Sequence, residues 1–152
     1  LAEIAIQTAK VARRFGVKPR VAMLSFSNFG TSSEMRTDRV EEAISIAREL
    51  DPELIIDGPM QADTALVPEI QKEYPFMSFD GPANILICPN LASANIAYKL
   101  LQRIAGAEMT GPILEGLSKP AHVLQRGDSV RDVVHMAAIC AVDAQRHDWQ
   151  KL

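Results

Sequence analysis

The sequence lacks the features that mark several common classes of protein. It has only two cysteines, Cys88 and Cys140, so it has no disulfide framework, and we expect two buried thiols in a reducing compartment. No stretch reaches the roughly 18 uninterrupted apolar residues of a transmembrane helix. The net charge of −3 gives no reason to expect nucleic acid or an anionic membrane as a partner. We therefore expect a cytoplasmic protein in which any anion site is local.

Sequence motifs for nucleotide cofactors and metals are also missing. There is no Gly-x-Gly-x-x-Gly run for a dinucleotide, and the polar loop after Val21–Ser25 lacks the Gly-Lys-Ser/Thr ending of a P-loop. His122, His135 and His147 are separated by 13 and 12 residues, so no pair lies one helical turn apart as zinc ligands often do. We interpret these histidines as surface residues or as residues with satisfied hydrogen bonds. The sequence thus predicts neither a cofactor nor a metal in this chain.

What the sequence does contain is a regular alternation of short apolar runs and helical patterns. Strands are predicted at Val21–Ser25, at Leu54–Asp57, which Gly58–Pro59 should end, at Ile85–Cys88 and at Met109–Leu114. Helices are predicted at Leu1–Gly16, Thr37–Leu50, Thr64–Tyr74, Leu91–Ile104 and Val130–Arg146. This alternation is typical of an α/β protein with a mainly parallel sheet covered on both faces. We expect a three-layer α/β/α sandwich in which the first three strands are adjacent.

The length of 152 residues predicts one domain spanning residues 1–152. Leu1 is not an initiator methionine, and it opens directly into a helical pattern. We therefore expect the chain to be a fragment of a longer polypeptide.

The residues before the last predicted helix form a candidate anion site. Gly127 allows a sharp turn, and Ser129 is predicted to cap a helix whose first turn carries Asp132. A helix N-terminus presents unpaired N–H groups and a partial positive charge, and Arg126 adds a planar cation that matches phosphate. The pattern fits a pocket for a phosphorylated ligand. It also fits a capped surface helix with a solvated arginine.

Three further polar clusters follow predicted strands, where open α/β sheets bind ligands. The loop Ser25–Ser33 is either a phosphate cradle or an ordinary connection. Asp57, Gln61 and Asp63 bind substrate or cap the next helix, and capping is the favoured interpretation. Asn95 and Lys99 share one face of a predicted helix and follow Asn90.

Four ordered blocks of the sequence resemble phosphate acetyl/butyryl transferases. They are Val21–Ser27, Ile56–Asp63, Pro89–Leu91 with Ala94–Lys99, and Gly111–Pro120 with Leu124–Asp132. The resemblance extends over nearly the whole chain. It implies an isocitrate/isopropylmalate dehydrogenase-like fold, as in phosphotransacetylases.

Finer details resemble the C-terminal domain of large bacterial NADP-dependent malic enzymes. The residues concerned are Ser27–Gly30, Gly58–Gln61, Ala83–Leu91, His135–Ala138 and Val142–Gln145. In that family the domain is regarded as an acyl-CoA sensor. The resemblance implies that NADP and a divalent metal bind another domain of the same polypeptide, and that acetyl-CoA is an effector here.

The resemblance also assigns roles to individual residues. It gives phosphate binding to Arg126 and thiol deprotonation to Asp132, while Gln125 stands where the transferases have a serine for the developing oxyanion. Glutamine is longer and occupies space that a tetrahedral intermediate needs, and losing one oxyanion donor typically slows a reaction by about 10²–10³. Further family arginines belong to an N-terminal part that this chain does not contain. We therefore expect no catalytic residues.

The resemblance thus predicts a regulatory acetyl-CoA-sensing and oligomerisation domain of an NADP-dependent malic enzyme, which decarboxylates malate oxidatively to pyruvate. The residues expected to bind acyl-CoA are Ser27, Asn95, Gly116, Gln125, Arg126 and Asp132. A homodimer or larger homo-oligomer is expected, with Leu91–Ile104 as a candidate contact. Two alternatives remain: an active phosphate acetyltransferase and a purely structural dimerisation domain.

Overall fold

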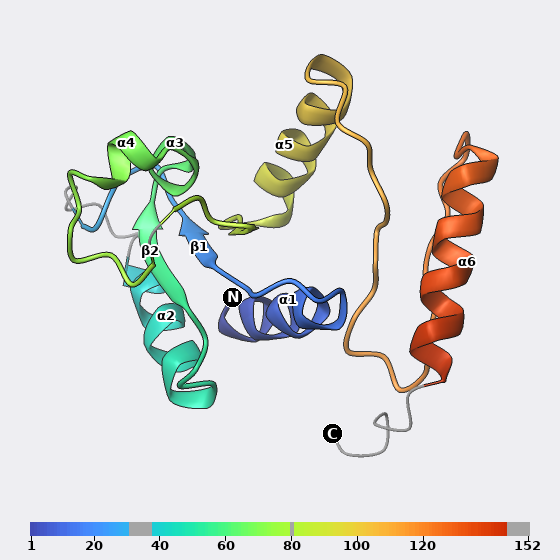
Figure 1. Ribbon diagram of the computed structural model, residues 1–152, viewed down its shortest axis with the longest axis horizontal. Coiled ribbons are helices and arrows are strands. Elements are labelled where there is room, and N and C mark those ends of the chain that lie inside the picture. Colours follow the sequence, from blue (N-terminus) through green and yellow to red (C-terminus); the bar gives the residue numbers. More distant parts are fainter. Residues whose placement is uncertain (31–37, 80, 146–152) are drawn as a thin grey trace. The chain divides into compact units, whose positions relative to one another are not determined.

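The computed structural model describes residues 1–30, 38–79 and 81–145, which belong to two compact units, Leu1–Tyr98 and Lys99–Leu152. Figure 1 shows the helices α1 (Ala2–Arg14), α2 (Asp38–Leu50), α3 (Ala62–Leu66), α4 (Pro68–Gln71), α5 (Leu91–Ile104) and α6 (Val130–Ala144). The strands are β1 (Val21–Leu24), β2 (Ile56–Met60) and β3 (Ile85–Ile87). In sequence, α5 crosses the boundary between the two units.

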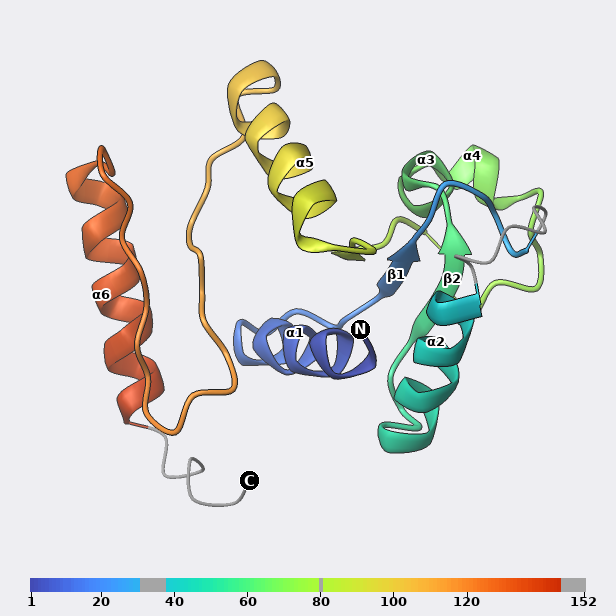
Figure 2. The ribbon, with the colours of Figure 1, turned by 180° about the vertical axis from the view of Figure 1, so that it is seen from behind.

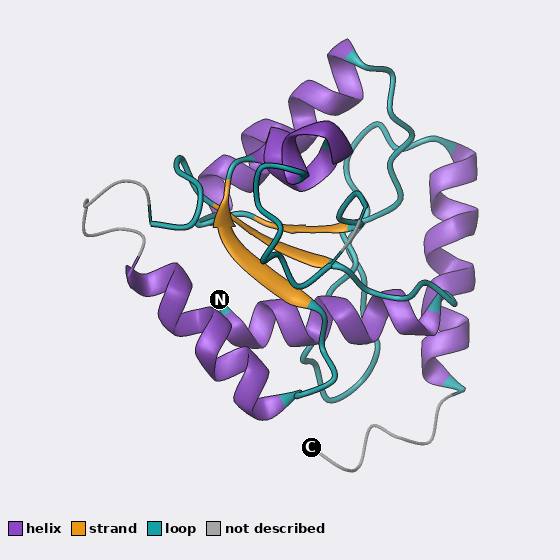
Figure 3. Cartoon of the chain, turned by 60° about the vertical axis from the view of Figure 1, so that its left-hand side comes forward, coloured by secondary structure: helices purple, strands orange, loops and turns teal. Residues whose placement is uncertain are grey.

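The first unit is built on one parallel sheet with strand order β2-β1-β3. Val21 of β1 pairs with Ile56 on one side and Ile85 on the other. Figure 3 shows the three strands side by side. The prediction that the first three strands are adjacent in one sheet is confirmed.

Neighbouring residues of the middle strand β1 point to opposite sides of the sheet, and Val21, Ala22 and Met23 are buried on both sides. At the edge strand β3 the covering is incomplete, because Leu86 is exposed. Val21 and Met23 belong to a core cluster with buried residues of α1 and α2. Ala22 belongs to a second cluster with Met60 and with Ala65 of α3. The expected α/β/α layering is therefore present in this unit.

The second strand does not end at Gly58–Pro59 as predicted. It continues through both residues to Met60. The register shifts between Ala22 and Leu24 of the partner strand, which is the irregularity of a β-bulge. Among the described strands β2 is an edge strand, and proline is tolerated at edges and bulges because no ladder N–H is needed there. The position also needs glycine: Gly58 has φ +137°, and a Cβ there would lie 2.6 Å from the Met23 carbonyl oxygen.

The helix predicted at Thr64–Tyr74 is in fact two short helices, α3 and α4, as Figure 2 shows. Val67 between them is extended, with φ −107° and ψ 109°. The cause is Pro68, whose ring disfavours helical dihedrals in the preceding residue. Proline then occupies the first turn of α4, where its missing N–H has no helical partner to lose.

Several helix ends agree with the sequence patterns. After α1, Gly16 has φ +74° and the Val17 N–H donates to the Ala12 carbonyl at 2.9 Å, so glycine ends this helix as predicted. Thr37, the predicted start of the helix that ends at Leu50, lies outside the described residues, and so does Arg146, the predicted end of α6.

The second unit contains no strand among its described residues, so the strand predicted at Met109–Leu114 is wrong. The physical reason is the lack of a neighbouring strand in that unit to pair with it, and Pro112 has no N–H to donate. Residues 105–129 are instead irregular. No helix in the described part of the chain combines the length and apolar character needed to cross a bilayer.

Candidate functional site

The start of α6 is capped as the sequence predicted. The Asp132 N–H donates to Oγ of Ser129 at 3.2 Å, and Oδ2 of Asp132 accepts from the Ser129 N–H at 2.9 Å. The two residues therefore form a capping box. Gly127 before them has φ +95°, which confirms the predicted turn.

This cap changes the chemistry available to Asp132. The Ser129 hydroxyl donates to Oδ2 of Asp132 at 2.7 Å. That hydrogen bond, followed by the one from the Ser129 backbone, lowers the pKa of Asp132 below its usual range, because both favour the charged carboxylate. A carboxylate with a lowered pKa is a weaker proton acceptor. The described contacts of the Asp132 carboxylate are therefore those of a helix cap.

Gln125 lies in a tight turn just before α6. Its N–H donates to Oδ2 of Asp128 at 2.6 Å, and the Asp128 N–H donates back to the Gln125 carbonyl at 3.1 Å. Its side-chain Oε1 accepts a hydrogen bond from Nζ of Lys99 at 3.3 Å. Sequence reasoning named Lys99 as a helix neighbour of Asn95 and missed this contact. No local pattern points to it, because the two residues are 26 positions apart.

Arginine side chains on either side of the cap differ in their partners. Arg131, in the first turn of α6, makes a two-pronged ion pair with Glu108 at 2.9 and 2.8 Å. Arg126 is exposed and forms no ion pair with any residue that the structure describes. Because Arg131 is already paired with Glu108, the guanidinium of Arg126 is the better placed of the two to donate hydrogen bonds to a phosphate. Gly116, also exposed, lies in the irregular segment with φ +81°.

Ser27 and Asn95 belong to the first unit, whereas the other four predicted ligand residues belong to the second. Ser27 is buried, and its hydroxyl has no hydrogen-bond partner among the described residues. Its loop is pinned to the end of β2, where the Gln61 N–H donates to Oδ1 of Asn28 at 2.7 Å. Burying a hydroxyl without a hydrogen-bond partner costs free energy. The Ser27 hydroxyl, near the carboxyl end of β1, can therefore form a hydrogen bond with a water or a ligand. Asn95 is exposed on α5.

The polar residues predicted to cap the next helix do so only in part. Oδ1 of Asp63 accepts a hydrogen bond from the Thr64 N–H at 2.8 Å in the first turn of α3, whereas Asp57 and Gln61 have other roles. Buried Asp57 accepts hydrogen bonds from the Ser78 N–H at 2.6 Å and the Gly58 N–H at 2.9 Å, and it pairs with Arg48 of α2 at 3.3 Å. Gln61 is the N-cap residue of α3 but gives it no side-chain cap. Asp57 therefore ties β2 to a neighbouring loop and to α2.

The described residues contain no group of three or more His, Cys, Asp and Glu side chains that could hold a metal ion. Cys88 and Cys140 are free thiols, and both are half-buried where buried thiols were expected. Partial burial raises the pKa of the Cys88 thiol.

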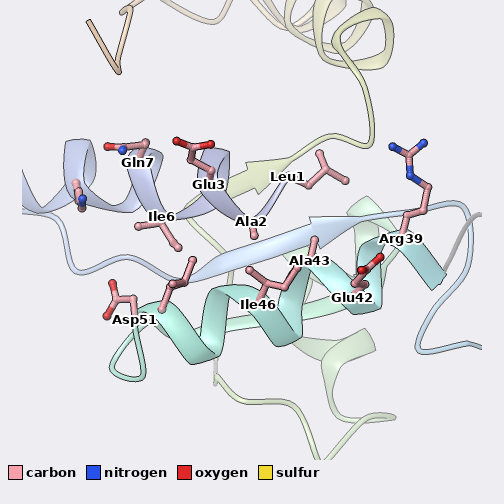
Figure 4. A pocket seen from close by; sticks show the side chains of 12 residues that line it. Leu1, Ala2, Glu3, Ile6, Gln7, Arg39, Glu42, Ala43, Ile46 and Asp51 are labelled. Carbon is pink, nitrogen blue, oxygen red and sulfur yellow. The ribbon is translucent and has the colours of Figure 1, made fainter. Parts of the chain in front are cut away.

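A hollow of about 710 Å³ lies between α1 and α2 of the first unit (Figure 4). Ala2, Ile6, Ala43 and Ile46 are among the apolar residues lining it, and charged residues of both signs, Glu3, Lys10, Arg39, Glu42 and Asp51, also line it. Because the charges are mixed, the hollow selects no class of ligand. None of the predicted site residues lines it.

Comparisons with known proteins agree with the fold. A family model described as phosphate acetyl/butaryl transferase matches residues 1–141. Phosphate acetyltransferase of Bacillus subtilis (strain 168) is 45% identical over 145 residues, which cover 95% of this chain and 45% of that protein. NADP-dependent malic enzyme of Escherichia coli (strain K12) is 47% identical over 148 residues, which cover 95% of this chain and 19% of that protein. A phosphotransacetylase crystal structure from Streptococcus pyogenes is 44% identical with a TM-score of 0.89, and the match covers 94% of this chain and 44% of that one. This chain thus spans less than half the length of each of these proteins.

Proposed function

The chain belongs to the phosphate acetyl/butaryl transferase family, and we propose that it is the acetyl-CoA-sensing domain of a larger, cytoplasmic NADP-dependent malic enzyme. Its relatives include both phosphate acetyltransferases and NADP-dependent malic enzymes. In this proposal residues 1–152 form one regulatory domain that needs no cofactor. NADP and a divalent metal bind the malic enzyme domain of the same polypeptide.

The arrangement from Gln125 to Asp132 carries the proposal. A transferase needs a base for the thiol, and the candidate base, Asp132, is engaged in the cap of α6 with a lowered pKa. Gln125 occupies the position where the family has a serine. Binding requires less than catalysis, since the phosphates of CoA need cations whether or not a reaction follows. Arg126 and Lys99 supply those cations, which supports binding without transfer.

Titration of the full-length protein with acetyl-CoA tests this proposal. We expect acetyl-CoA to inhibit malate oxidation, with roughly a 5- to 150-fold effect on apparent affinity, the usual range of coupling between sites. Arg126→Ala should remove a phosphate contact and move the inhibition curve to higher acetyl-CoA. Arg39→Ala, at an exposed arginine of the first unit, is the matched control and should leave the curve in place. Equal shifts in the two variants would contradict a phosphate contact at Arg126.

An active phosphate acetyltransferase is the second candidate, favoured by relatives of that name at 45% identity and by the presence of Arg126. The test is CoA-dependent turnover of acetyl phosphate by the full-length protein. We expect none above background. Robust turnover would refute the regulatory proposal. Loss of that turnover in Arg126→Ala would then place the reaction at this site.

We also propose that α5 is a contact between two copies of this chain. The helix buries none of its residues, and Leu91 and Ile104 are 83% and 81% exposed. Light scattering at tens of micromolar should therefore give at least a dimer mass. Ile104→Asp should lower that mass, whereas Arg103→Ala, at the adjacent exposed position, should not. A dimer that binds no acetyl-CoA would instead favour a purely structural role.

A further inference from the structure

His122 is a buried side chain in the irregular segment of the second unit, and its two ring nitrogens face different parts of that unit. Nδ1 accepts a hydrogen bond from the Leu114 N–H at 3.2 Å. Nε2 lies 3.4 Å from Oδ2 of Asp143 on α6, and the two side chains are only 4% and 9% exposed. The Cys140 thiol, one turn earlier on α6, donates to the Pro120 carbonyl at 3.8 Å. The imidazole therefore joins two parts of the segment to one face of α6.

These contacts determine where the proton of the neutral ring lies. A nitrogen that accepts a hydrogen bond carries no proton, so neutral His122 carries its proton on Nε2. Nε2 lies 3.4 Å from the Asp143 carboxylate but forms no hydrogen bond with any described residue. A second proton would place an N–H on Nδ1 opposite the Leu114 N–H, and two donors cannot form a hydrogen bond. Protonation therefore keeps the ion-pair partner Asp143 and removes the bond to Leu114.

The segment that His122 anchors carries candidate ligand residues. Gly116 follows Leu114 by two positions, and Gln125 follows His122 by three. Residues 105–129 contain no helix or strand, so side-chain contacts have a large share in fixing their position. Losing the bond to Leu114 removes a direct link between the stretch leading to Gly116 and the imidazole.

We propose that His122 is a positioning residue for acyl-CoA, and that its protonation releases the Leu114–Gly116 stretch and weakens binding. The proposal rests on the proposed acyl-CoA site. His122 and Asp143 form a proton-dependent latch on the segment, closed when the imidazole is neutral.

Other ionisable groups occur on both elements that meet at His122. The irregular segment carries Glu108, Glu115, Lys119, Arg126 and Asp128, and α6 carries Arg131, Asp132, His135, Cys140 and Asp143. His135 is the other histidine among the described residues of this unit, and its charge acts on Asp132. His135→Gln therefore separates the two histidines experimentally.

Two replacements of His122 separate its two contacts. Asparagine retains an acceptor at the position of Nδ1 and does not titrate, whereas glutamine retains a donor at the position of Nε2 and loses the acceptor for Leu114. In the full-length protein, calorimetry should show acetyl-CoA affinity falling by about threefold to tenfold from pH 8 to pH 6, the effect of roughly one hydrogen bond. His122→Asn should bind as the wild type does at pH 8 and keep that affinity at pH 6. His122→Gln should bind weakly at both pH values.

The control variant His135→Gln should retain the pH dependence of the wild type. If it abolishes that dependence, or if His122→Asn titrates as the wild type does, His122 is not the group responsible and the proposal is overturned.

Hydrogen exchange of the unliganded protein tests the latch without a ligand. Exchange protection of the Leu114 amide, corrected for the intrinsic effect of pH, should fall from pH 8 to pH 6 in the wild type and stay constant in His122→Asn. Equal protection at both pH values overturns the latch, whatever the binding results. If Leu114 responds but acetyl-CoA binds at neither pH, the latch stands and the proposed function fails.

Discussion

The two units of the chain are stabilised in different ways. In Leu1–Tyr98 a parallel sheet buries apolar side chains on both of its faces. In the described part of Lys99–Leu152, Met136 and Asp143 are the buried residues of α6. That unit has instead a capping box and the contacts of one buried histidine, while its Arg131–Glu108 ion pair is too exposed to add much stability. The first unit therefore owes its stability to burial, and the second depends on individual polar contacts.

Exposed apolar side chains sharpen this contrast. Val130, Val134 and Val142 of α6 are all exposed, as is most of α5. Apolar surface of this kind marks interaction sites when it is contiguous. Substitutions that act through burial should therefore be severe in the first unit and mild in the second.

The largest effect is expected from Ile56→Ala in the core of the first unit. Ile56 is fully buried in β2, and removing its side chain should lower the free energy of unfolding by about 2–5 kcal/mol. Val130→Ala, at a residue 82% exposed, should change it by less than about 0.5 kcal/mol. Urea unfolding of the two variants measures both losses in the free energy of unfolding. Similar losses would contradict the proposed difference between the two units.

A second effect concerns two glycines with positive φ, one in each unit. Gly58→Ala places its Cβ 2.6 Å from the Met23 carbonyl oxygen, so we expect a loss of about 1–3 kcal/mol in the free energy of unfolding. Gly127→Ala meets no atom within 4 Å and should be less destabilising. Urea unfolding also compares the free energies of unfolding of these two variants. A greater loss in Gly127→Ala than in Gly58→Ala would contradict the structure.

A smaller and more local effect is expected from Ser129→Ala, which removes the capping box of α6. The loss should be about 1 kcal/mol, as for other N-caps. Hydrogen exchange should increase in the first turn of α6 and remain unchanged in β1. Increased exchange in both units would show that the cap stabilises more than the second unit.

The smallest effect is a pH dependence of the same cap. The pKa of Asp132 is lowered in the folded protein, so its contribution to stability is complete above the pKa of an unfolded aspartate, about 3.9. The contribution is lost as the pH falls through the lower folded value. Exchange in the first turn of α6 should therefore increase below about pH 4. Asp132→Asn should not show this step, and a step that persists in the variant would assign it to another group.

Features set by neighbouring residues could be predicted from the sequence. The buried strands appear as short apolar runs, and the cap at Ser129 needs only Asp132 three positions later. The end of β2 could not be predicted, because tolerance of Pro59 depends on which strands flank it. The prediction of a strand at Met109–Leu114 was wrong for the same reason, since a strand requires a partner strand that its own residues do not specify.

In the candidate site, too, local features could be predicted from the sequence and long-range contacts could not. Its local part, Gly127 with the capped helix start, follows from residue types and spacing. Its long-range contacts do not: Lys99 reaches Gln125 across 26 positions, and His122 meets Asp143 across 21. Such pairs depend on how an irregular segment is laid against helices, and no periodic pattern encodes this.

The strand order has a consequence for how the protein is made. β1 is the middle strand of the sheet but the first of the described strands in sequence, and its partners Ile56 and Ile85 come 35 and 64 positions after Val21. At synthesis rates of about 5–20 residues per second, roughly 3–13 seconds separate Val21 from Ile85 on the ribosome. During that interval β1 has at most one of the two partners that the described sheet gives it. The nascent chain therefore exposes an apolar strand edge, a natural target for chaperones, until β3 has emerged.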